Sequence, residues 1–380
     1  MRVAFTTTFD AQDIHNWSGT PYYMSRAFML EGVDINYIGP LARKLPPFFK
    51  AKQIWNKYVS NQRESPRFNT IAAKYYSKQV NDHLQTMTID AIISPLVNPI
   101  AYLDCDKPII LWTDSVYAAL VGFYPDFAYH SANSIKQGNK ITEACLERCT
   151  LAIFSSEWAA NSAIELYGAD RKKVKVVPFG ANIESSPTFE QVRYLIKQRA
   201  KDKIKLLFLA KSWERKGGDM VFAVAKELHD AGHPVELNII GHTPKMDTIL
   251  PFVNCLGFQS KQTPEGRAKI AELLSQSHFL ILPSRAEAYG IAFCEANAYG
   301  LPCLTSYTGG ISTIVKDNMN GMTFALHAPV SAYCDYIVNL MQNRSQYEAL
   351  ALSAYHEYNT RLNWKTATRQ VKTMIEAIYQ

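Results

Sequence analysis

The chain has 380 residues, of which 47% are hydrophobic and 19% are charged, and its formal net charge is +6. This length exceeds one ordinary core and predicts two domains, and the composition excludes a disordered or fibrous chain. A run of about eighteen apolar residues does not occur, so we expect no transmembrane helix. The mild positive charge suits an anionic substrate or an anionic membrane surface, and it gives little support to nucleic-acid binding.

The cysteines and histidines show no metal-binding pattern, and the cysteines and the N-terminus indicate the cellular compartment. The seven cysteines form no C-x-x-C pair and have no zinc spacing, and the nine histidines show no metal-ligand pattern. The first residues, MRVAFTTTF, lack the apolar centre of a signal peptide and predict a strand. We therefore expect reduced thiols in a cytoplasmic protein.

The first strand, at residues 3–7, is followed by a polar loop that contains Gly19. A helix is predicted to start near Pro21 and to end before Gly32. Strand, glycine-bearing loop and helix form an arrangement that accepts anions. A plain surface turn is the alternative at Gly19.

Residues 43–67 are basic and aromatic. They hold seven Lys or Arg side chains against the single acid Glu64, with Pro46, Phe48, Trp55 and Tyr58 interleaved. This composition fits a flap that faces a membrane or binds an acceptor. The alternative is a solvated segment whose aromatic side chains are tucked into the domain, and both interpretations stay open.

Asp114 follows a buried strand predicted at residues 107–113. The C-terminal ends of strands in an open parallel sheet face the ligand crevice, so Asp114 is a candidate to orient an acceptor. A role as a helix N-cap is the alternative. Other first-half strands are predicted at 34–38, 91–94, 151–155 and 174–180.

The second half alternates helices with strands at 204–209, 235–240, 253–258 and 279–283. The loop after the first of these strands reads AKSWERKGG and holds Lys211, Arg215 and Lys216. Glycines and a helix follow, so this loop is predicted to place cations over phosphates. An ordinary solvated position is the alternative for each cation.

The stretch from Ser284 to Gly310 concentrates the polar and glycine positions of the chain. Two strand–glycine–helix turns, at Gly290 and at Gly309–Gly310, offer unpaired N–H groups and helix dipoles that suit a diphosphate. Glu287 and Glu295, eight residues apart, are placed to accept hydrogen bonds from hydroxyl groups. A ligand with phosphates in its middle and hydroxyls at both ends is a nucleotide sugar.

This stretch resembles the signature of the group 1 (family 4) glycosyltransferases, which have the GT-B fold. Cys303 departs from the family, which often has Val there. The residues in register with the family pattern are Pro283, Ser284, Glu287, Tyr289, Gly290, Glu295, Ala296, Ala298, Gly300, Pro302, Gly309 and Gly310.

The resemblance implies an α/β fold of two Rossmann-like domains that face each other across a cleft. Residues 1–182 would bind the acceptor and residues 183–361 the donor, while a C-terminal helix at about 362–380 would cross back to the first domain. Pro178, Gly180 and Asn182 match the family's interdomain turn.

The resemblance also implies roles for residues of this chain. Lys216 would reach the distal phosphate together with Lys211 or Arg215, and Gly19 would approach the diphosphate from the first domain. Glu287 would face the transferred sugar and Glu295 the ribose. The family often has His near the end of a strand where this chain has Asp114. Backbone groups of Tyr289, Gly290, Ile291, Ala292, Gly309 and Gly310 complete the expected donor site, and Glu287, Lys216, Arg215 and Asp114 are the expected catalytic residues.

The expected function is hexose transfer from a UDP- or GDP-linked donor to an acceptor hydroxyl, with retention of configuration and without a metal or other cofactor. The acceptor would be a saccharide, a lipid-linked sugar or a small molecule in glycan, polysaccharide or glycolipid assembly. Residues 43–67 would add peripheral contact with the inner face of the cell membrane. Asp104 and Asp106 are interpreted as a turn and not as a metal site. A nucleotide-sugar 2-epimerase and a non-catalytic nucleotide-sugar-binding protein remain alternatives.

Overall fold

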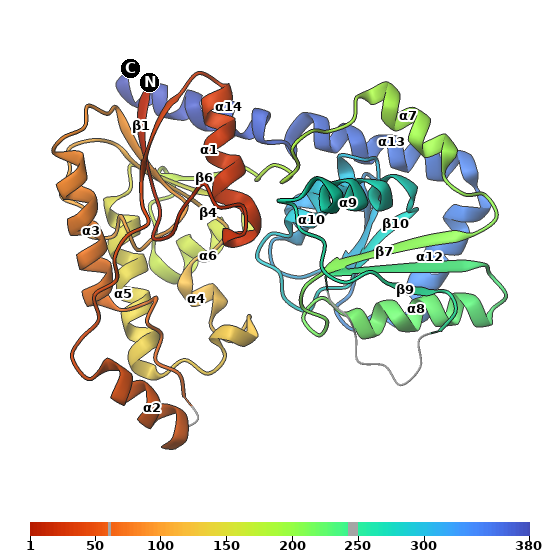
Figure 1. The fold of residues 1–380 in the computed structure, drawn as a ribbon, viewed down its shortest axis with the longest axis horizontal. Helices are drawn as coiled ribbons and strands as arrows, with labels where there is room; N and C mark the ends of the chain where they lie inside the picture. The colour runs from red at the N-terminus through yellow and green to blue at the C-terminus, as the bar shows by residue number, and fades with distance from the viewer. Residues whose placement is uncertain (60–61, 242–249) are drawn as a thin grey trace. The chain divides into compact units, whose positions relative to one another are not determined.

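The computed structural model describes residues 1–59, 62–241 and 250–380, which form two compact units (Figure 1). The first unit comprises Met1–Pro178 and Trp364–Gln380, and the second comprises Phe179–Asn363. Each unit contains one six-stranded sheet in which all neighbouring strands are parallel. This is the two-domain α/β fold class expected from the sequence.

The first sheet has the strand order β2-β1-β3-β4-β5-β6. Its inner strands β3, β4 and β5 are short, buried and largely apolar, as expected where helices cover both faces of the sheet. β4, with the sequence IILWT, is buried at every position. The strands are β1 (Arg2–Thr6), β2 (Asp34–Ile38), β3 (Ala91–Ser94), β4 (Ile109–Thr113), β5 (Leu151–Phe154) and β6 (Val174–Val176).

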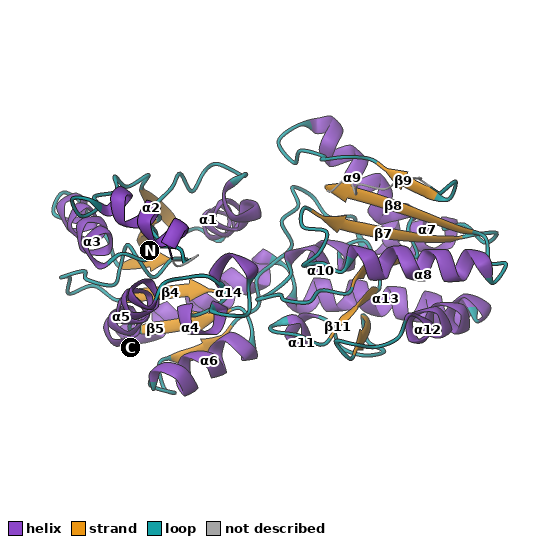
Figure 2. Ribbon diagram, turned by 90° about the horizontal axis from the view of Figure 1, so that it is seen from below, coloured by secondary structure: helices purple, strands orange, loops and turns teal. Residues whose placement is uncertain are grey.

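Helices of the first unit lie on both sides of this sheet (Figure 2). α1 and the C-terminal α14 pack against each other, and α3 packs against α5 in a core shared with α6. The helices are α1 (Thr20–Leu30), α2 (Phe49–Val59), α3 (Thr70–Leu84), α4 (Tyr117–Leu120), α5 (Ala132–Arg148), α6 (Glu157–Tyr167) and α14 (Trp364–Glu376).

The second sheet has the strand order β12-β11-β10-β7-β8-β9. Its inner strand β10, with the sequence FLIL, is buried throughout. The strands are β7 (Ile204–Ala210), β8 (Val235–Gly241), β9 (Val253–Cys255), β10 (Phe279–Leu282), β11 (Cys303–Ser306) and β12 (Gly321–Phe324).

The second unit also carries helices in two groups. α8 packs against α12, whereas α7 contacts α9 and α13, and α13 contacts α10. The helices are α7 (Phe189–Gln198), α8 (Gly218–Asp230), α9 (Pro264–Gln276), α10 (Ile291–Asn297), α11 (Ile311–Ile314), α12 (Val330–Gln342) and α13 (Arg344–Arg361). Among the residues that the structure describes, no helix has the length and apolar character needed to cross a bilayer.

Polar side chains fix where several helices begin. Ser156 caps α6, because its hydroxyl accepts a hydrogen bond from the N–H of Ala159. Thr188 and Gln191 form a capping box at α7. The N-cap alternative for Asp114 is wrong, since the N-cap residue of α4 is Val116.

β6 and β9 end earlier than the strands predicted at 174–180 and 253–258, and two further elements were not predicted at all. Residues 43–67 contain α2, a helix that the sequence analysis did not predict. β12 was also not predicted, because GMTF is short and only half apolar. It joins the sheet beside β11, where a Cβ on Gly321 would lie 1.9 Å from the Cys303 carbonyl oxygen, so glycine permits the close pairing.

Candidate functional site

The strand order of the second sheet reverses between β7 and β10. From β7 the chain proceeds outward to β9, and it then returns to β10 on the other side of β7. In open parallel sheets, ligands bind beyond the C-terminal ends of the strands at such a reversal. The loops after β7 and β10 meet there, since the N–H of Arg285 donates to the carbonyl of Arg215 at 2.8 Å. Both loops were singled out in the sequence.

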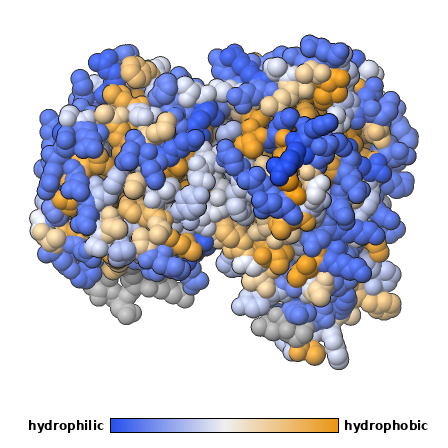
Figure 3. Space-filling model, turned by 180° about the vertical axis from the view of Figure 1, so that it is seen from behind, coloured by the Kyte–Doolittle hydropathy of each residue, from blue (hydrophilic) through white to orange (hydrophobic). Residues whose placement is uncertain are grey.

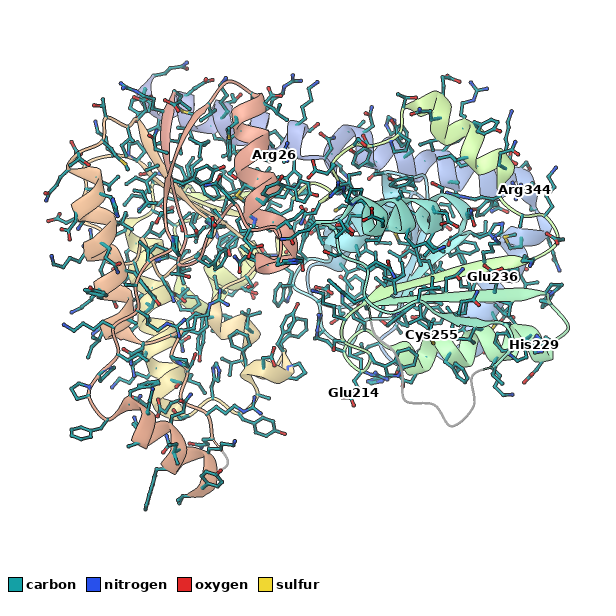
Figure 4. All side chains as sticks on the ribbon, viewed as in Figure 1. Arg26, Glu214, His229, Glu236, Cys255 and Arg344 are labelled. Atoms are coloured by element: carbon teal, nitrogen blue, oxygen red, sulfur yellow. The ribbon has the colours of Figure 1, made fainter. Side chains whose placement is uncertain are left out.

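Two cations of the first loop converge on one carboxylate of the second. Lys216 Nζ contacts Glu287 Oε2, and Arg215 Nη1 lies 3.3 Å from the same oxygen. Arg215 Nη1 also donates to the carbonyl of Ala286 at 2.9 Å. Figure 4 labels Glu214 on this loop, next to Arg215. The cluster contains two cations and one anion, so its excess positive charge favours an anionic ligand.

Gly217 allows this convergence. It has a φ of +70°, and a Cβ there would lie 2.2 Å from the Pro283 carbonyl oxygen. The loop after β7 therefore lies directly against the end of β10, in a backbone conformation that favours glycine. Lys216 reaches Glu287 because its neighbour has no side chain.

Burial shapes the charge of Lys216. Burial, and then the positive charge of Arg215, lower the pKa of this ammonium group. The Glu287 carboxylate acts in the opposite direction, because a nearby negative charge favours the protonated amine. An anionic ligand would likewise favour the charged form of Lys216.

Glu295 lies on α10, which begins after Gly290 in a left-handed conformation with φ +101°. Its side chain is buried, and Lys261 Nζ contacts Glu295 Oε1 and also donates to the Asn182 carbonyl at 3.2 Å. Burial raises the pKa of Glu295, whereas Lys261 opposes that change. Lys261 was missed in the sequence, where the lone cation of the 259–263 loop was the available signal.

The Gly309–Gly310 turn supports the Glu287 loop. The N–H of Gly310 donates to the Glu287 carbonyl at 3.1 Å. That amide was expected to bind phosphate, but here it positions the carboxylate-bearing loop. Gly309 has a φ of +53° and precedes α11, which is only one turn long.

The side chain of Tyr289 belongs to the core of the second unit. It is 3% exposed, and its hydroxyl donates to the Phe179 carbonyl at 2.6 Å. Burial raises the pKa of this phenol well above its ordinary value. Only backbone groups of Tyr289 are left for a ligand, while Ile291 and Ala292 in the first turn of α10 are half-buried.

Lys211 takes a different position from the other two cations. Its Nζ lies 4.7 Å from the ring centroid of Phe258, a side chain that is half exposed. Arg215, and not Lys211, therefore shares the Glu287 carboxylate with Lys216. Cation and aromatic ring together form a separate surface at the ends of β7 and β9.

The first unit holds the two remaining predicted residues. Gly19, with φ +85°, ends a run of left-handed residues that includes Trp17 (φ 46°) and Ser18 (φ 56°). Residues other than glycine rarely adopt this backbone conformation, and backbone strain of this kind is concentrated at functional loops. The run lies between β1 and α1, and the first sheet reverses its strand order between β1 and β3.

Asp114 follows β4 in the same unit. The Ser115 hydroxyl donates to its Oδ1 at 3.0 Å. Burial raises the pKa of Asp114, and Ser115, Arg67 and Trp17 partly offset that effect. Arg67 was not singled out as a site residue in the sequence. In the described parts of the chain, no group of three His, Cys, Asp or Glu side chains is arranged to hold a metal ion.

Comparison with known proteins agrees with this architecture. Over essentially the full length of both chains, the fold is similar to that of sucrose-phosphate synthase from Thermosynechococcus elongatus, with a TM-score of 0.72 and 13% identity, covering 100% of this chain and 99% of that one. Anabaena HepE in complex with UDP and glucose matches with a TM-score of 0.62 and 14% identity, covering 99% and 100%.

Curated sequences match over only part of this chain. The D-inositol 3-phosphate glycosyltransferase of Nocardia farcinica is 26% identical over 214 residues, which cover 51% of this chain and 46% of that protein. The N-acetyl-alpha-D-glucosaminyl L-malate synthase of Bacillus anthracis is 26% identical over 147 residues, covering 37% and 38%. The chain thus spans about half the length, or less, of the curated relatives it matches.

The fold is therefore the GT-B fold of glycosyltransferases. Residues 195–357, which lie within the second unit, match the family model of glycosyl transferases group 1.

Proposed function

We propose that this protein is a glycosyltransferase that moves a sugar from a nucleotide-sugar donor to an acceptor hydroxyl. The observation that carries the proposal is the convergence of Lys216 and Arg215 on Glu287 at the strand-order reversal of the second sheet. A buried cluster with excess positive charge, beside loops rich in backbone N–H groups, is suited to a diphosphate.

Lys216 and Arg215 would stabilise the leaving group. Breaking the sugar–phosphate bond adds negative charge to the nucleoside diphosphate, and fixed positive groups stabilise that charge as it develops. Each charge-assisted hydrogen bond contributes about 1.5–3 kcal/mol. We propose that these side chains do so without a metal ion.

The two glutamates would bind the two ends of the donor. Glu287, held by Lys216 and by the backbone of Gly310, would accept hydroxyl groups of the transferred sugar. Glu295, held by Lys261, would accept the ribose hydroxyls. A carboxylate accepts several hydrogen bonds, so each glutamate can keep its lysine while it binds the ligand.

The donor and acceptor classes follow from the relatives. The HepE structure contains UDP and glucose, which supports a hexose donor linked to UDP, with a GDP-linked donor as the second choice. Matching relatives are named for inositol 3-phosphate and malate, which both carry hydroxyl groups. Asp114 would orient the acceptor hydroxyl. Configuration would be retained by front-face transfer, with the departing phosphate accepting the proton.

The experiment measures donor hydrolysis and transfer across UDP- and GDP-sugars. Lys216→Ala and Glu287→Ala should each lower the rate of sugar release about a hundredfold or more, because each removes charge stabilisation at the leaving group or the sugar. Donor binding, followed by calorimetry, should weaken more in Lys216→Ala than in Glu287→Ala, because only the former removes a cation.

Lys269→Ala is the matched control, since Lys269 pairs with Glu272 at 3.0 Å through partly exposed side chains of α9 in the same unit. It should leave the rate unchanged, and thermal melting should show that all three variants fold. Wild-type rates in Lys216→Ala would contradict the proposal. Epimerised donor without an acceptor would identify a 2-epimerase, and binding without turnover would identify a non-catalytic protein.

A further inference from the structure

The positive charge of the chain is concentrated in one segment. The chain has 40 Lys and Arg residues, of which seven lie in residues 43–67, and 34 Asp and Glu residues, of which one lies there. The rest of the chain therefore has 33 positive and 33 negative residues. The whole net charge of +6 is therefore carried by this segment, which contains α2. An excess of one sign of charge on one element attracts surfaces of the opposite sign.

The polar face of α2 turns inward. Glu64, the single acid of residues 43–67, follows α2 and is buried. It accepts hydrogen bonds from Asn56 of α2 and from Ser131, both at 2.9 Å, and it pairs with Lys52 of α2 at 3.0 Å. Asn133 and Ser134 on α5 bind the other carboxylate oxygen, both at 3.1 Å. The helix is thus attached to the first unit mainly through charged and polar groups.

The apolar face of α2 consequently turns outward. Ile54, Trp55 and Tyr58 are 59%, 67% and 79% exposed. Their spacing of three and four residues places them on one side of the helix, opposite Phe49, Gln53 and Asn56. This orientation is the reverse of an ordinary surface helix, whose apolar side faces the core.

Lys50 and Lys57 lie seven residues apart and are both exposed. At 3.6 residues per turn they occupy the flank between the two faces of α2. Lys57 Nζ lies 5.7 Å from the Tyr58 ring centroid. Figure 4 shows side chains of α2 extending from the end of the first unit, and Figure 3 shows apolar residues reaching the surface there.

We propose that α2 is a docking surface for an anionic lipid bilayer. Trp and Tyr prefer the boundary between headgroups and acyl chains, and an amphipathic helix with aromatic and basic residues lies in that plane. The Lys50 and Lys57 side chains extend toward lipid phosphates while the ring of Trp55 enters the apolar layer.

Charge complementarity selects this partner. An anionic membrane offers negative headgroups and an apolar layer on one surface, and it matches both features of α2. Nucleic acid would use the lysines but leave the Ile54 and Val59 side chains without an apolar partner. A second copy of the chain would bring the same lysines together, and like charges repel.

The test uses the full chain and vesicles, and it requires no turnover. Cosedimentation with phosphatidylcholine vesicles containing about 30% phosphatidylglycerol should recover the protein, whereas pure phosphatidylcholine should not. Trp55→Ser with Tyr58→Ser should lower the partition coefficient about tenfold. Lys50→Glu with Lys57→Glu should lower it about 25-fold or more, because each surface lysine contributes about a fivefold factor.

The matched control for charge is Arg171→Glu with Lys172→Glu, two exposed residues in the turn before β6. The matched control for an exposed aromatic is Tyr194→Ser on α7. Both should partition like the wild type. The tryptophan emission of the wild type should shift to the blue only with anionic vesicles, and this shift should be absent in Trp55→Ser with Tyr58→Ser.

Three outcomes would overturn the proposal. The first is no partitioning onto anionic vesicles, and the second is partitioning that Trp55→Ser with Tyr58→Ser leaves unchanged. The third is self-association that the same double variant abolishes, which would identify a second copy as the partner. The donor-hydrolysis rate in solution should be the same in all these variants, so failure here does not affect the proposed transfer activity.

Discussion

At the scale of single residues, three buried glutamates share one arrangement. Glu64, Glu287 and Glu295 are each almost inaccessible, and each contacts a lysine. A buried carboxylate is costly unless it is paired and hydrogen-bonded. Glu64 holds a helix in place, whereas the other two lie next to loops at the end of a parallel sheet. Burial alone therefore does not distinguish a structural carboxylate from a candidate ligand-binding one, but position relative to the sheet does.

Glu64 is expected to make the protein sensitive to acid. Burial tends to raise its pKa, but Lys52, Ser131, Asn133 and Ser134 together lower it below 4.5. The folded pKa lies below the unfolded value, so this stabilisation is fully present above the unfolded pKa. It is lost as the pH falls through the folded pKa. Glu64→Gln should lower the free energy of unfolding at neutral pH by about 2 kcal/mol.

Chemical denaturation at several pH values measures this effect. The difference between wild type and Glu64→Gln should shrink as the pH falls below 4.5. Glu143→Gln, at an exposed position of α5, is the control and should leave the free energy of unfolding unchanged. A difference that does not change with pH would show that the carboxylate charge is not what anchors α2.

The sequence identified Lys216, Glu287 and Glu295 because each belongs to a local motif beside a glycine or a strand end. It did not identify Lys261, whose partner Glu295 lies 34 positions away, because such a pairing depends on the tertiary fold. It also gave no direction for the Tyr289 side chain, which enters the core. Local spacing predicts which loops form the candidate site, but not which side chains from other parts of the chain contact those loops or which of their own side chains enter the core.

At the scale of elements, the parallel strands were the most predictable features. Strands β2 and β3 agree with the predicted residues 34–38 and 91–94. The inner strand β3 was predictable because a strand covered on both faces is a continuous apolar run between polar turns. α2 was not predicted, and the sequence also gave no sign that its apolar side faces away from the core. An orientation that contradicts the usual rule is set by Glu64 and α5, which lie outside the helix.

Substitution of Gly217 tests how closely the loop after β7 must approach β10. An alanine in the left-handed backbone conformation costs about 1–2 kcal/mol, and Gly217→Ala should lower the free energy of unfolding of the second unit by more than this. The added Cβ would also meet the Pro283 carbonyl oxygen at 2.2 Å. The shifted loop should move Lys216 from Glu287, so donor binding should weaken as well.

Gly232→Ala is the matched control, because Gly232 has a φ of +84° but nothing lies within 4 Å of a Cβ there. It should show the backbone cost alone and leave donor binding intact. Thermal melting and calorimetry measure both quantities. An equal loss of free energy of unfolding in the two variants would mean that the loop after β7 can accommodate a Cβ at residue 217.

At the scale of the whole molecule, the first unit is built from both ends of the chain. α14 packs on α1, and Arg369 pairs with Glu31 at 2.7 Å. The rings of Trp364 and Trp112 are in edge contact, with centroids 5.7 Å apart. The C-terminal residues thus complete the core of the N-terminal sheet, while the second unit is one continuous stretch.

Trp364→Ala should destabilise the first unit by about 3–5 kcal/mol, because it removes a buried indole from a packed core. Hydrogen exchange should increase in β4 and α1, while the strands of the second unit keep their protection. Tyr194→Ala, at an exposed aromatic on α7, should change neither. Faster exchange in β7 and β10 to the same extent would show that the two units unfold together.

The discontinuity of the first unit has a consequence during synthesis. A ribosome delivers residues 1–178 first, yet the partner of α1 and Trp112 arrives only with residues 364–380. The second unit has all of its segments earlier, so it is expected to mature before the first. Until residues 364–380 have been synthesised, nascent chains would expose the apolar side of α1 to chaperones, and a premature stop near residue 363 would leave that side permanently uncovered.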